Sequence, residues 1–207
     1  MNYFRMDYLL LCKWVIINFL GAFFLWYAWK QGWIAIILAT DISFITPVIG
    51  LLTLFGVGLT GWWAAKISKE LSLVKKGNIN EVLNQFYPSP EKFSFDDAKN
   101  LESLKLLLTN RLSSMRHLAW ALVVLGLIGT ILGFVIVLLG IDISLVADIS
   151  KLPMVMVEIT TGLGIALYTT LAGALGNLWV LINYNMLTTA TVQLYSYIIT
   201  NHEVLEG

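Results

Sequence analysis

Charged residues are scarce in this chain, and so are the residue types that build metal or redox sites. Only 13% of the 207 residues are charged, against roughly 25% in soluble domains. Hydrophobic residues make up 58%, and the mean hydropathy is +0.79. Thirteen basic and thirteen acidic residues give a net charge of zero, so nothing favours a nucleic-acid partner and we expect none. The composition is typical of a membrane protein.

Catalytic and metal-binding motifs are missing as well. Cys12 is the only cysteine, so no intrachain disulfide can form, and we interpret this thiol as a packing residue. His117 and His202 are too few for a histidine metal cluster, and the sequence holds no CxxC, HExxH or GxxxxGK[ST] motif. The longest polar stretch is too short and too helical in pattern to enclose a substrate. We therefore expect no enzyme and no resident metal or other cofactor.

Long apolar runs are what the chain has in abundance. Four of them approach the roughly 20 residues that a membrane-spanning helix needs: 9–29, 45–65, 118–141 and about 155–187. The first run is too long for a signal peptide and ends in bulky Trp26, Tyr27 and Trp29, so we expect it to remain in the protein. The fold class predicted is all-α, a polytopic membrane protein with four transmembrane helices. The break inside the first hairpin is assigned on Lys30, Gln31, Gly32 and Asp41, because residues 34–40 between them are apolar as well.

Basic residues orient these spans. If both termini and the stretch 66–116 are cytoplasmic, only Lys30 and Lys151 lie outside, as the positive-inside rule expects. Trp29 and Trp33 then mark the outer edge of the membrane. The inner edges are marked by three more tryptophans, which are Trp62, Trp63 and Trp120.

The spans divide the chain into four regions. They are a transmembrane hairpin over 1–65, a cytoplasmic helical region over 66–117, a channel-forming hairpin over 118–190 and a short cytoplasmic tail over 191–207. Residues 65–83 read as a helical extension of the second span, and Tyr87-Pro88-Ser89-Pro90 breaks the chain. Residues 94–97 offer N-cap candidates for one continuous helix over about 97–141. The fourth span is predicted to continue to about Tyr197, so the last two spans extend into the cytoplasm.

Each of the last two spans places its small residues on one face of a helix, with 100° allowed per residue. On the third span this face is about 100° wide and holds Gly126, Gly129, Thr130, Gly133 and Gly140. On the fourth it is about 120° wide and holds Gly162, Ala166, Thr169, Thr170, Gly173, Gly176 and Asn177. Such faces commonly let helix backbones pack closely, and a threonine can satisfy its hydroxyl on the preceding turn. Helix packing is therefore one explanation for both faces.

An ion pathway is the other explanation. Thr130 and Thr170 lie at similar depths, and a hydroxyl both donates and accepts, so a cluster of them can solvate a cation, water or a carboxyl group from another chain. Neither face carries an ionisable residue, although proton relays normally place one inside the membrane. Glu158, about 18 Å before Thr170 at 1.5 Å per residue, is interpreted as an outer-interface residue. Any titrating group must then come from a partner.

Two motifs on these faces, GLIGTILG at 126–133 and ALYTTLAGALGN at 166–177, resemble the paired channel helices of the MotA/TolQ/ExbB proton channel family. The resemblance covers about residues 101–190. It implies a pentamer in the bacterial inner membrane around two copies of a single-span partner of the MotB, ExbD or TolR kind, whose membrane aspartate binds the moving ion. It also implies that Thr130, Thr169 and Thr170 line the ion path, while the glycines, Ala166 and Asn177 pack helices or face the partner.

Within that family the four-span outline resembles the flagellar stator subunits rather than the three-span TolQ and ExbB branch. The cytoplasmic stretch is about half the length expected of a stator, which leaves its rotor contacts unassigned. In the TolQ and ExbB branch a glutamate stands five residues before the threonine that matches Thr170, and here that position is Ile165. The short tail after Leu187 differs from the long tail of the phage-defence members. What the motor would move is left open.

The predicted function is a pore-forming subunit of an ion-driven motor. A structural four-span scaffold without ion conduction is the alternative, and a small-solute carrier is disfavoured because no inverted repeat or interrupted span is visible. The doubled threonine resembles that of sodium-driven stator subunits, and carbonyls beside Gly126 or Ala166 would add oxygen ligands for a hard cation. We expect sodium as the coupling ion, with protons as the alternative.

Overall fold

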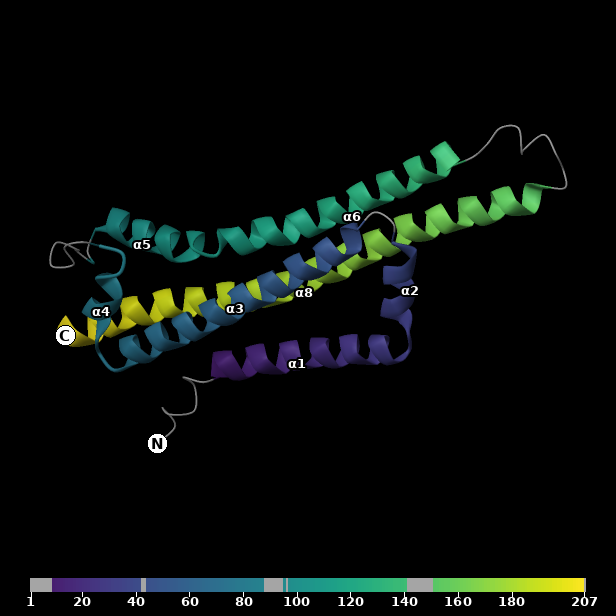
Figure 1. Cartoon of the computed structure of the whole chain (residues 1–207). Coiled ribbons are helices and arrows are strands. Elements are labelled where there is room, and N and C mark those ends of the chain that lie inside the picture. Colours follow the sequence, from purple (N-terminus) through teal and green to yellow (C-terminus); the bar gives the residue numbers. More distant parts are fainter. Residues whose placement is uncertain (1–8, 42–43, 88–94, 96, 141–150, 207) are drawn as a thin grey trace. The chain divides into compact units, whose positions relative to one another are not determined.

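The computed structural model describes residues 9–41, 44–87, 95, 97–140 and 151–206, and in them every regular element is a helix. Figure 1 shows these helices in chain order. They are α1 (Leu9–Lys30), α2 (Trp33–Thr40), α3 (Ile45–Lys75), α4 (Ile79–Leu83), α5 (Ala98–Asn110), α6 (Ser113–Gly140) and α8 (Leu152–Glu206). The predicted all-α class is confirmed.

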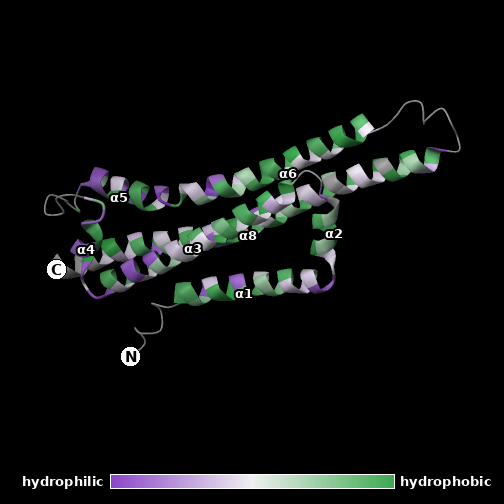
Figure 2. Ribbon diagram, in the orientation of Figure 1, coloured by the Kyte–Doolittle hydropathy of each residue, from purple (hydrophilic) through white to green (hydrophobic). Residues whose placement is uncertain are grey.

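Four helical stretches are long and apolar enough to cross a membrane, and they correspond to the four predicted spans. They are Leu9–Lys30, Ile45–Lys75, Ala98–Gly140 and Leu152–Thr200. Hydrophobic residues cover α6 over most of its length (Figure 2), and the most apolar window of its stretch has a mean hydropathy of 3.0. The chain is a multi-pass membrane protein.

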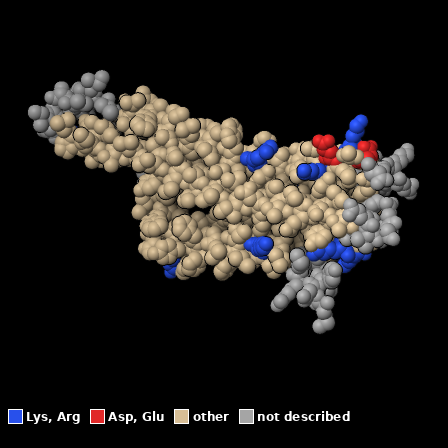
Figure 3. Space-filling view, turned by 180° about the vertical axis from the view of Figure 1, so that it is seen from behind, with Lys and Arg blue, Asp and Glu red and all other residues tan. Residues whose placement is uncertain are grey.

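The chain forms two compact units, and α1, α3, α6 and α8 contribute to both. The first unit comprises Met1–Phe19, Val57–Arg116 and Leu181–Gly207, and the second comprises Leu20–Gly56 and His117–Val180. On the face drawn in Figure 3, acidic and basic side chains gather over the first unit, whereas the surface of the second is almost uncharged. The first unit therefore contains most of the charged residues of the described chain.

The first unit has a hydrophobic core made by the end of α3, by α4 and α5, and by the later part of α8. Leucines of α5 and of the following turn, Leu104, Leu108 and Leu112, are buried in it, as the helical spacing predicted. Asp97 caps α5 by accepting a hydrogen bond of 2.9 Å from the backbone N–H of Lys99, so one of the predicted N-cap candidates is confirmed.

Two helix predictions in this unit are wrong in detail. The extension over 65–83 ends at Lys75, because Gly77 takes a left-handed conformation (φ 84°) and Asn78 N–H bonds to Leu73 O in a Schellman motif before α4 begins. The continuous helix over 97–141 is interrupted after Asn110, where Leu112 and Met115 bond to carbonyls three residues back.

Neither glycine nor proline stands at the interruption after Asn110. The hydroxyl of Thr109 donates to the carbonyls of Lys105 (2.7 Å) and Leu106 (3.2 Å), but Thr188 and Thr189 donate to carbonyls of the preceding turn within the uninterrupted α8, so such bonds do not by themselves explain the break. The continuation of the fourth span to about Tyr197 is confirmed, and α8 runs nine residues further, to Glu206. Several parts of these predictions lie outside the described residues, namely residues 88–90, 94, 96 and 141.

Polar side chains inside the apolar stretches tie α1 to the rest of the first unit. Asn183 of α8 is fully buried, and its side-chain oxygen accepts a hydrogen bond of 2.9 Å from the amide of Asn18 on α1. The indole N–H of Trp14 donates to the hydroxyl of Thr60 on α3 at 3.1 Å. Hydrogen bonds of this kind stabilise helix association in lipid, where no hydrophobic effect drives it.

One buried ion pair joins α3 to the turn between α5 and α6. The guanidinium of Arg111 bonds both carboxylate oxygens of Glu70, at 2.9 and 2.7 Å, and the two side chains are only 8% and 2% exposed. The guanidinium also lies over the rings of Trp63 and Phe86, at 5.4 and 5.7 Å from their centroids. This pair holds the turn after α5 in place.

In the second unit α1 turns into the short helix α2 at Gly32, which has a left-handed conformation (φ 76°) that favours glycine. The predicted break near Lys30 is therefore confirmed, although an additional apolar helix follows it. Asp41 then anchors the start of α3, because its carboxylate accepts a hydrogen bond of 2.8 Å from the backbone N–H of Thr46.

Candidate functional site

The small-residue faces of α6 and α8 lie against each other within the second unit. A Cβ added to Gly126 would lie 3.3 Å from the Cα of Thr170, and one added to Gly133 would lie 2.9 Å from the Cβ of Ala166. A Cβ on Gly173 would lie 2.6 Å from the carbonyl oxygen of Leu122. Close backbone approach requires glycine here. We call these close-packed residues the glycine seam: Gly126, Gly129, Gly133, Gly162, Ala166 and Gly173.

Gly162 belongs to the seam because a Cβ there would collide with Val137 of α6. The other residues predicted for these faces lie at the edges of the contact, where Gly176 lies against Thr53 of α3. Asn177 is half-buried, and Gly140 is exposed. The side chains of Glu158 and Ile165 lie outside what the structure describes. The geometry supports the helix-packing role of the glycine faces, and contact with a partner remains a prediction.

The three predicted threonines occupy two different environments. Thr169 is fully buried, donates to the carbonyl of Ala166 at 3.0 Å, and lies where a Cβ on Gly129 would be 2.5 Å from it. Thr170 is exposed and Thr130 is half-buried. Thr169 therefore packs inside the seam, while Thr130 and Thr170 lie at its accessible edge.

Thr130 and Thr170 meet across the two helices, as their similar depths predicted. Their hydroxyl oxygens are in direct hydrogen-bond contact. The hydroxyl of Thr130 also reaches the carbonyls of Gly126 (3.2 Å) and Ala166 (3.4 Å). The hydroxyl of Thr170 reaches the same two carbonyls, at 3.3 and 3.1 Å. We call the two hydroxyls and the two carbonyls the four-oxygen cluster.

The four-oxygen cluster has more acceptors than donors. Each threonine contributes one O–H proton, and the carbonyls of Gly126 and Ala166 also accept backbone N–H groups of their own helices, so the protons are still fewer than the lone pairs of the four oxygens. Lone pairs therefore remain open in the cluster. Such a cluster suits a ligand that brings a donor or a positive charge, such as a protonated carboxyl group, a water molecule or a hard cation.

No acid or base among the described residues belongs to this cluster. The described part of the chain also contains no group of three or more His, Cys, Asp or Glu side chains placed to hold a metal ion. An ion that stops here would thus be held by neutral oxygens, unless a second chain brings a carboxylate. This agrees with the absence of ionisable residues from both faces of the sequence.

A family model covers the part of the chain that contains this geometry. The model of the MotA/TolQ/ExbB proton channel family matches residues 72–198, which is more than half of the chain and includes all of α6 and nearly all of α8. The chain belongs to this family. The match begins after α1 and α2 and near the end of α3, so the N-terminal hairpin lies outside the matched region. Neither the curated proteins nor the solved structures gave a match.

Family membership supports a channel or motor subunit in general terms. The resemblance of the two motifs is therefore confirmed at the level of the family, and the coupling ion, the partner and the role of each threonine remain predictions. Sequence reasoning missed Asn18 and Asn183, which join α1 to α8. The signal was available, because an amide inside an apolar span is costly unless a neighbouring helix bonds it.

Proposed function

We propose that this chain is the pore-forming subunit of an ion-driven motor in the bacterial inner membrane, with both termini in the cytoplasm. In this proposal several copies, most simply five, surround a single-span partner that carries a membrane aspartate. Family membership supports the motor class. The observation that carries the ion path is the four-oxygen cluster, which lies at the accessible edge of two packed helices.

The cluster can serve the partner's carboxyl group in both of its charge states. With sodium as the coupling ion, Na⁺ bound to the carboxylate would be coordinated by the lone pairs that the cluster leaves open; with protons, the protonated carboxyl group would donate its O–H to them. Once the ion has left, both threonine hydroxyls can rotate away from the carbonyls of Gly126 and Ala166 and donate to the carboxylate. Alternating neutralisation of the aspartate would then change which subunit holds it best.

Each transferred ion supplies limited work. One charge that moves down a potential of 100 mV yields about 2.3 kcal/mol. A power stroke against a substantial load therefore requires several ions, which fits a ring with several equivalent clusters. The close-packed glycine seam would act as a rigid strut within each subunit, because it holds Thr130 and Thr170 at a fixed separation while the partner moves.

Replacing the threonines with valine tests the proposal. Thr130→Val and Thr170→Val keep the side-chain shape and delete the hydroxyl, so we expect each to weaken the docking of the ion-carrying acid. A hydrogen bond to a charged group contributes roughly 1.5–3 kcal/mol, which corresponds to a loss of about 13- to 160-fold in ion-driven activity. Thr130→Ser and Thr170→Ser restore the hydroxyl and should restore most of the activity.

Thr161→Val is the matched control. Thr161 lies on α8 as well and is exposed. Its hydroxyl donates to the carbonyl of Val157 in its own helix, at 2.8 Å, and does not belong to the four-oxygen cluster. Activity is measured as ion flux in vesicles that contain the chain and its partner, with the mass of the complex determined in the same preparation. Full activity in the Thr130→Val/Thr170→Val double variant would show that these hydroxyls serve only packing.

A structural scaffold is the second candidate, and one observation favours it. The small-residue faces, which motivated a pore, are satisfied by packing α6 on α8 within a single chain. The scaffold needs no partner aspartate. A neighbouring gene that encodes one N-terminal span with an aspartate, and a product that co-purifies with this chain, would favour the motor. A monomeric mass in mild detergent, with that partner co-expressed, would favour the scaffold.

A further inference from the structure

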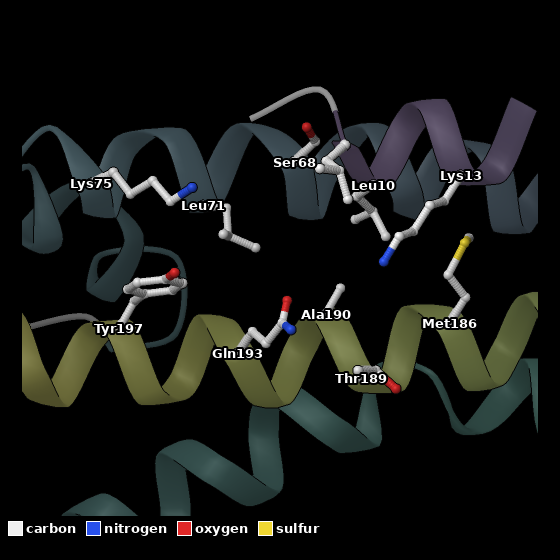
Figure 4. Close-up of a pocket in the computed structure, with 11 residues that line it drawn as sticks. Leu10, Lys13, Ser68, Leu71, Lys75, Met186, Thr189, Ala190, Gln193 and Tyr197 are labelled. Atoms are coloured by element: carbon white, nitrogen blue, oxygen red, sulfur yellow. The ribbon is translucent and has the colours of Figure 1, made fainter. Parts of the chain in front are cut away.

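A cavity of about 290 Å³ opens between α1, α3 and α8 in the first unit, whereas the four-oxygen cluster belongs to the second. Figure 4 shows its lining. The apolar part of the lining consists of Leu9, Leu10, Leu71, Met186 and Ala190, and the polar part consists of Lys13, Ser68, Lys75, Thr189, Gln193 and Tyr197. The cavity is therefore amphipathic.

The charge in this cavity has one sign. Of the eleven described residues that line it, two are lysines and none is acidic. The amino groups of Lys13 and Lys75 enter from opposite ends and point into the space between α3 and α8 (Figure 4). The ammonium of Lys75 lies 5.4 Å from the ring centroid of Tyr197. Because an ammonium has three N–H donors, it can bind an anion while it keeps its other contacts.

The position of the cavity along the helices matches the boundary of a membrane. Lys13 lies in the first turns of α1, Ser68 lies just beyond the predicted end of the second span at residue 65, and Thr189 lies just beyond the predicted end of the fourth at residue 187. The cavity thus begins where the predicted spans end, at the level of the lipid headgroups. It continues to Lys75 and Tyr197, each ten residues beyond the predicted end of its span, or about 15 Å at 1.5 Å per residue.

We propose that this cavity binds the headgroup and glycerol backbone of one anionic phospholipid. Lys13 and Lys75 bind the phosphate, Gln193 and Thr189 contact the headgroup, and the leucines and Met186 contact the first methylenes of the acyl chains. Basic pockets between transmembrane helices on the cytoplasmic side suit anionic lipids, because that leaflet carries negative charge. The proposal rests on the cytoplasmic orientation given above and is independent of ion conduction.

The first test removes the positive charge. The purified full-length chain in mild detergent is titrated with phosphatidylglycerol, and bound lipid is counted by native mass spectrometry. One lysine near anionic lipid corresponds to about a fivefold change in affinity, so Lys13→Gln/Lys75→Gln should bind phosphatidylglycerol about 25-fold more weakly. Lys69→Gln/Lys76→Gln is the matched control, because both lysines are exposed on or next to α3 and neither lines the cavity. It should stay within about twofold of wild type.

A second variant keeps the fold and adds a negative charge. Gln193→Glu is isosteric at an exposed position of α8 and places a carboxylate between the two lysines, so it should lower the affinity about fivefold. Asn185→Asp adds the same charge at another exposed position of α8 that does not line the cavity. It should leave the affinity unchanged within about twofold.

Further arms of the experiment identify the occupant. Wild-type protein should prefer phosphatidylglycerol to phosphatidylcholine, and millimolar inorganic phosphate should not displace the bound lipid. Equal binding of phosphatidylcholine, equal loss in the Lys69→Gln/Lys76→Gln control, or full displacement by inorganic phosphate would overturn the proposal. A second copy of the chain or the partner, rather than lipid, would occupy the cavity if the cysteine of Gln193→Cys cross-linked to that protein, and this result would overturn the proposal as well. Since no arm reads ion flux, these results stay separate from those on Thr130 and Thr170.

Discussion

Gly173 is the position where the packing of α6 on α8 leaves least room. A Cβ there would lie 2.6 Å from the carbonyl oxygen of Leu122 and 3.0 Å from the Cα of Gly126, and both are backbone atoms that cannot rotate away. Ordinary contact begins at 3.4 Å, so the added methyl group would be 0.8 Å too close to the carbonyl. Gly173→Ala must therefore push the two helices apart.

The magnitude follows from two opposing terms. Overpacking a well-packed contact costs about 1–3 kcal/mol, whereas replacing glycine with alanine inside a helix gains about 0.8–1 kcal/mol of helix propensity. The net expectation is a loss of up to about 2 kcal/mol in the free energy of unfolding. The separation also draws the hydroxyl of Thr170 away from that of Thr130, so ion-driven activity should fall along with stability.

Gly58→Ala provides the matched control. Gly58 lies inside α3 and is exposed, and a Cβ there would meet nothing within 4 Å. Only the helix-propensity gain applies, so this variant should be as stable as wild type or up to about 1 kcal/mol more stable.

The assay is reversible unfolding in mixed micelles, in which a denaturing detergent is titrated into the folded protein and helix content is followed by circular dichroism. Wild type, Gly173→Ala and Gly58→Ala are compared under identical conditions. If Gly173→Ala unfolds at the same detergent fraction as Gly58→Ala, the backbone contact between the two helices is not as close as described, and the reasoning about the glycine seam fails.

Three further predictions concern other parts of the chain. Asn18→Leu and Asn183→Leu should each lower the free energy of unfolding by about 0.6–1.7 kcal/mol in the same assay. Because the two amides bond each other, a double-mutant cycle should show coupling, and additive losses would argue against that bond. Glu70→Ala should lower the free energy of unfolding by about 3–5 kcal/mol, because it leaves the charge of Arg111 buried without a partner. Glu70→Leu/Arg111→Met should recover most of that loss, and an equal loss in this double variant would contradict the reasoning. Exchanging sodium for potassium at fixed pH and membrane potential should abolish activity, and undiminished activity would assign protons as the coupling ion.

The spans and their faces were predictable from sequence because both depend on local composition and periodicity. A helical wheel places Gly126 and Thr130 on one side of α6, and the structure agrees. It does not say what lies opposite that side. Packing against α8 of the same chain and packing against a partner give the same periodicity, so the burial of Thr169 in the seam could not be read from the pattern.

The two helix ends that sequence reasoning missed have different origins. The helix ends at Lys75 because the following turn closes on Gly77, and this glycine is a local signal that the sequence offered. The break after Asn110 carries no glycine or proline, so local rules alone predicted an uninterrupted helix there. A tertiary contact lies beside that break, because the buried Arg111 depends on Glu70, which lies 41 residues earlier in the chain.

The bond between Asn18 and Asn183 also has a consequence for biosynthesis. Asn183 leaves the ribosome 165 residues after Asn18, which corresponds to roughly 8–33 s at about 5–20 residues per second. During that interval the side chain of Asn18 has only local partners, such as the carbonyl of Trp14 in its own helix, to which it donates at 2.8 Å. The helix that carries Asn18 can therefore complete its contact with α8 only after the span that carries Asn183 has been inserted.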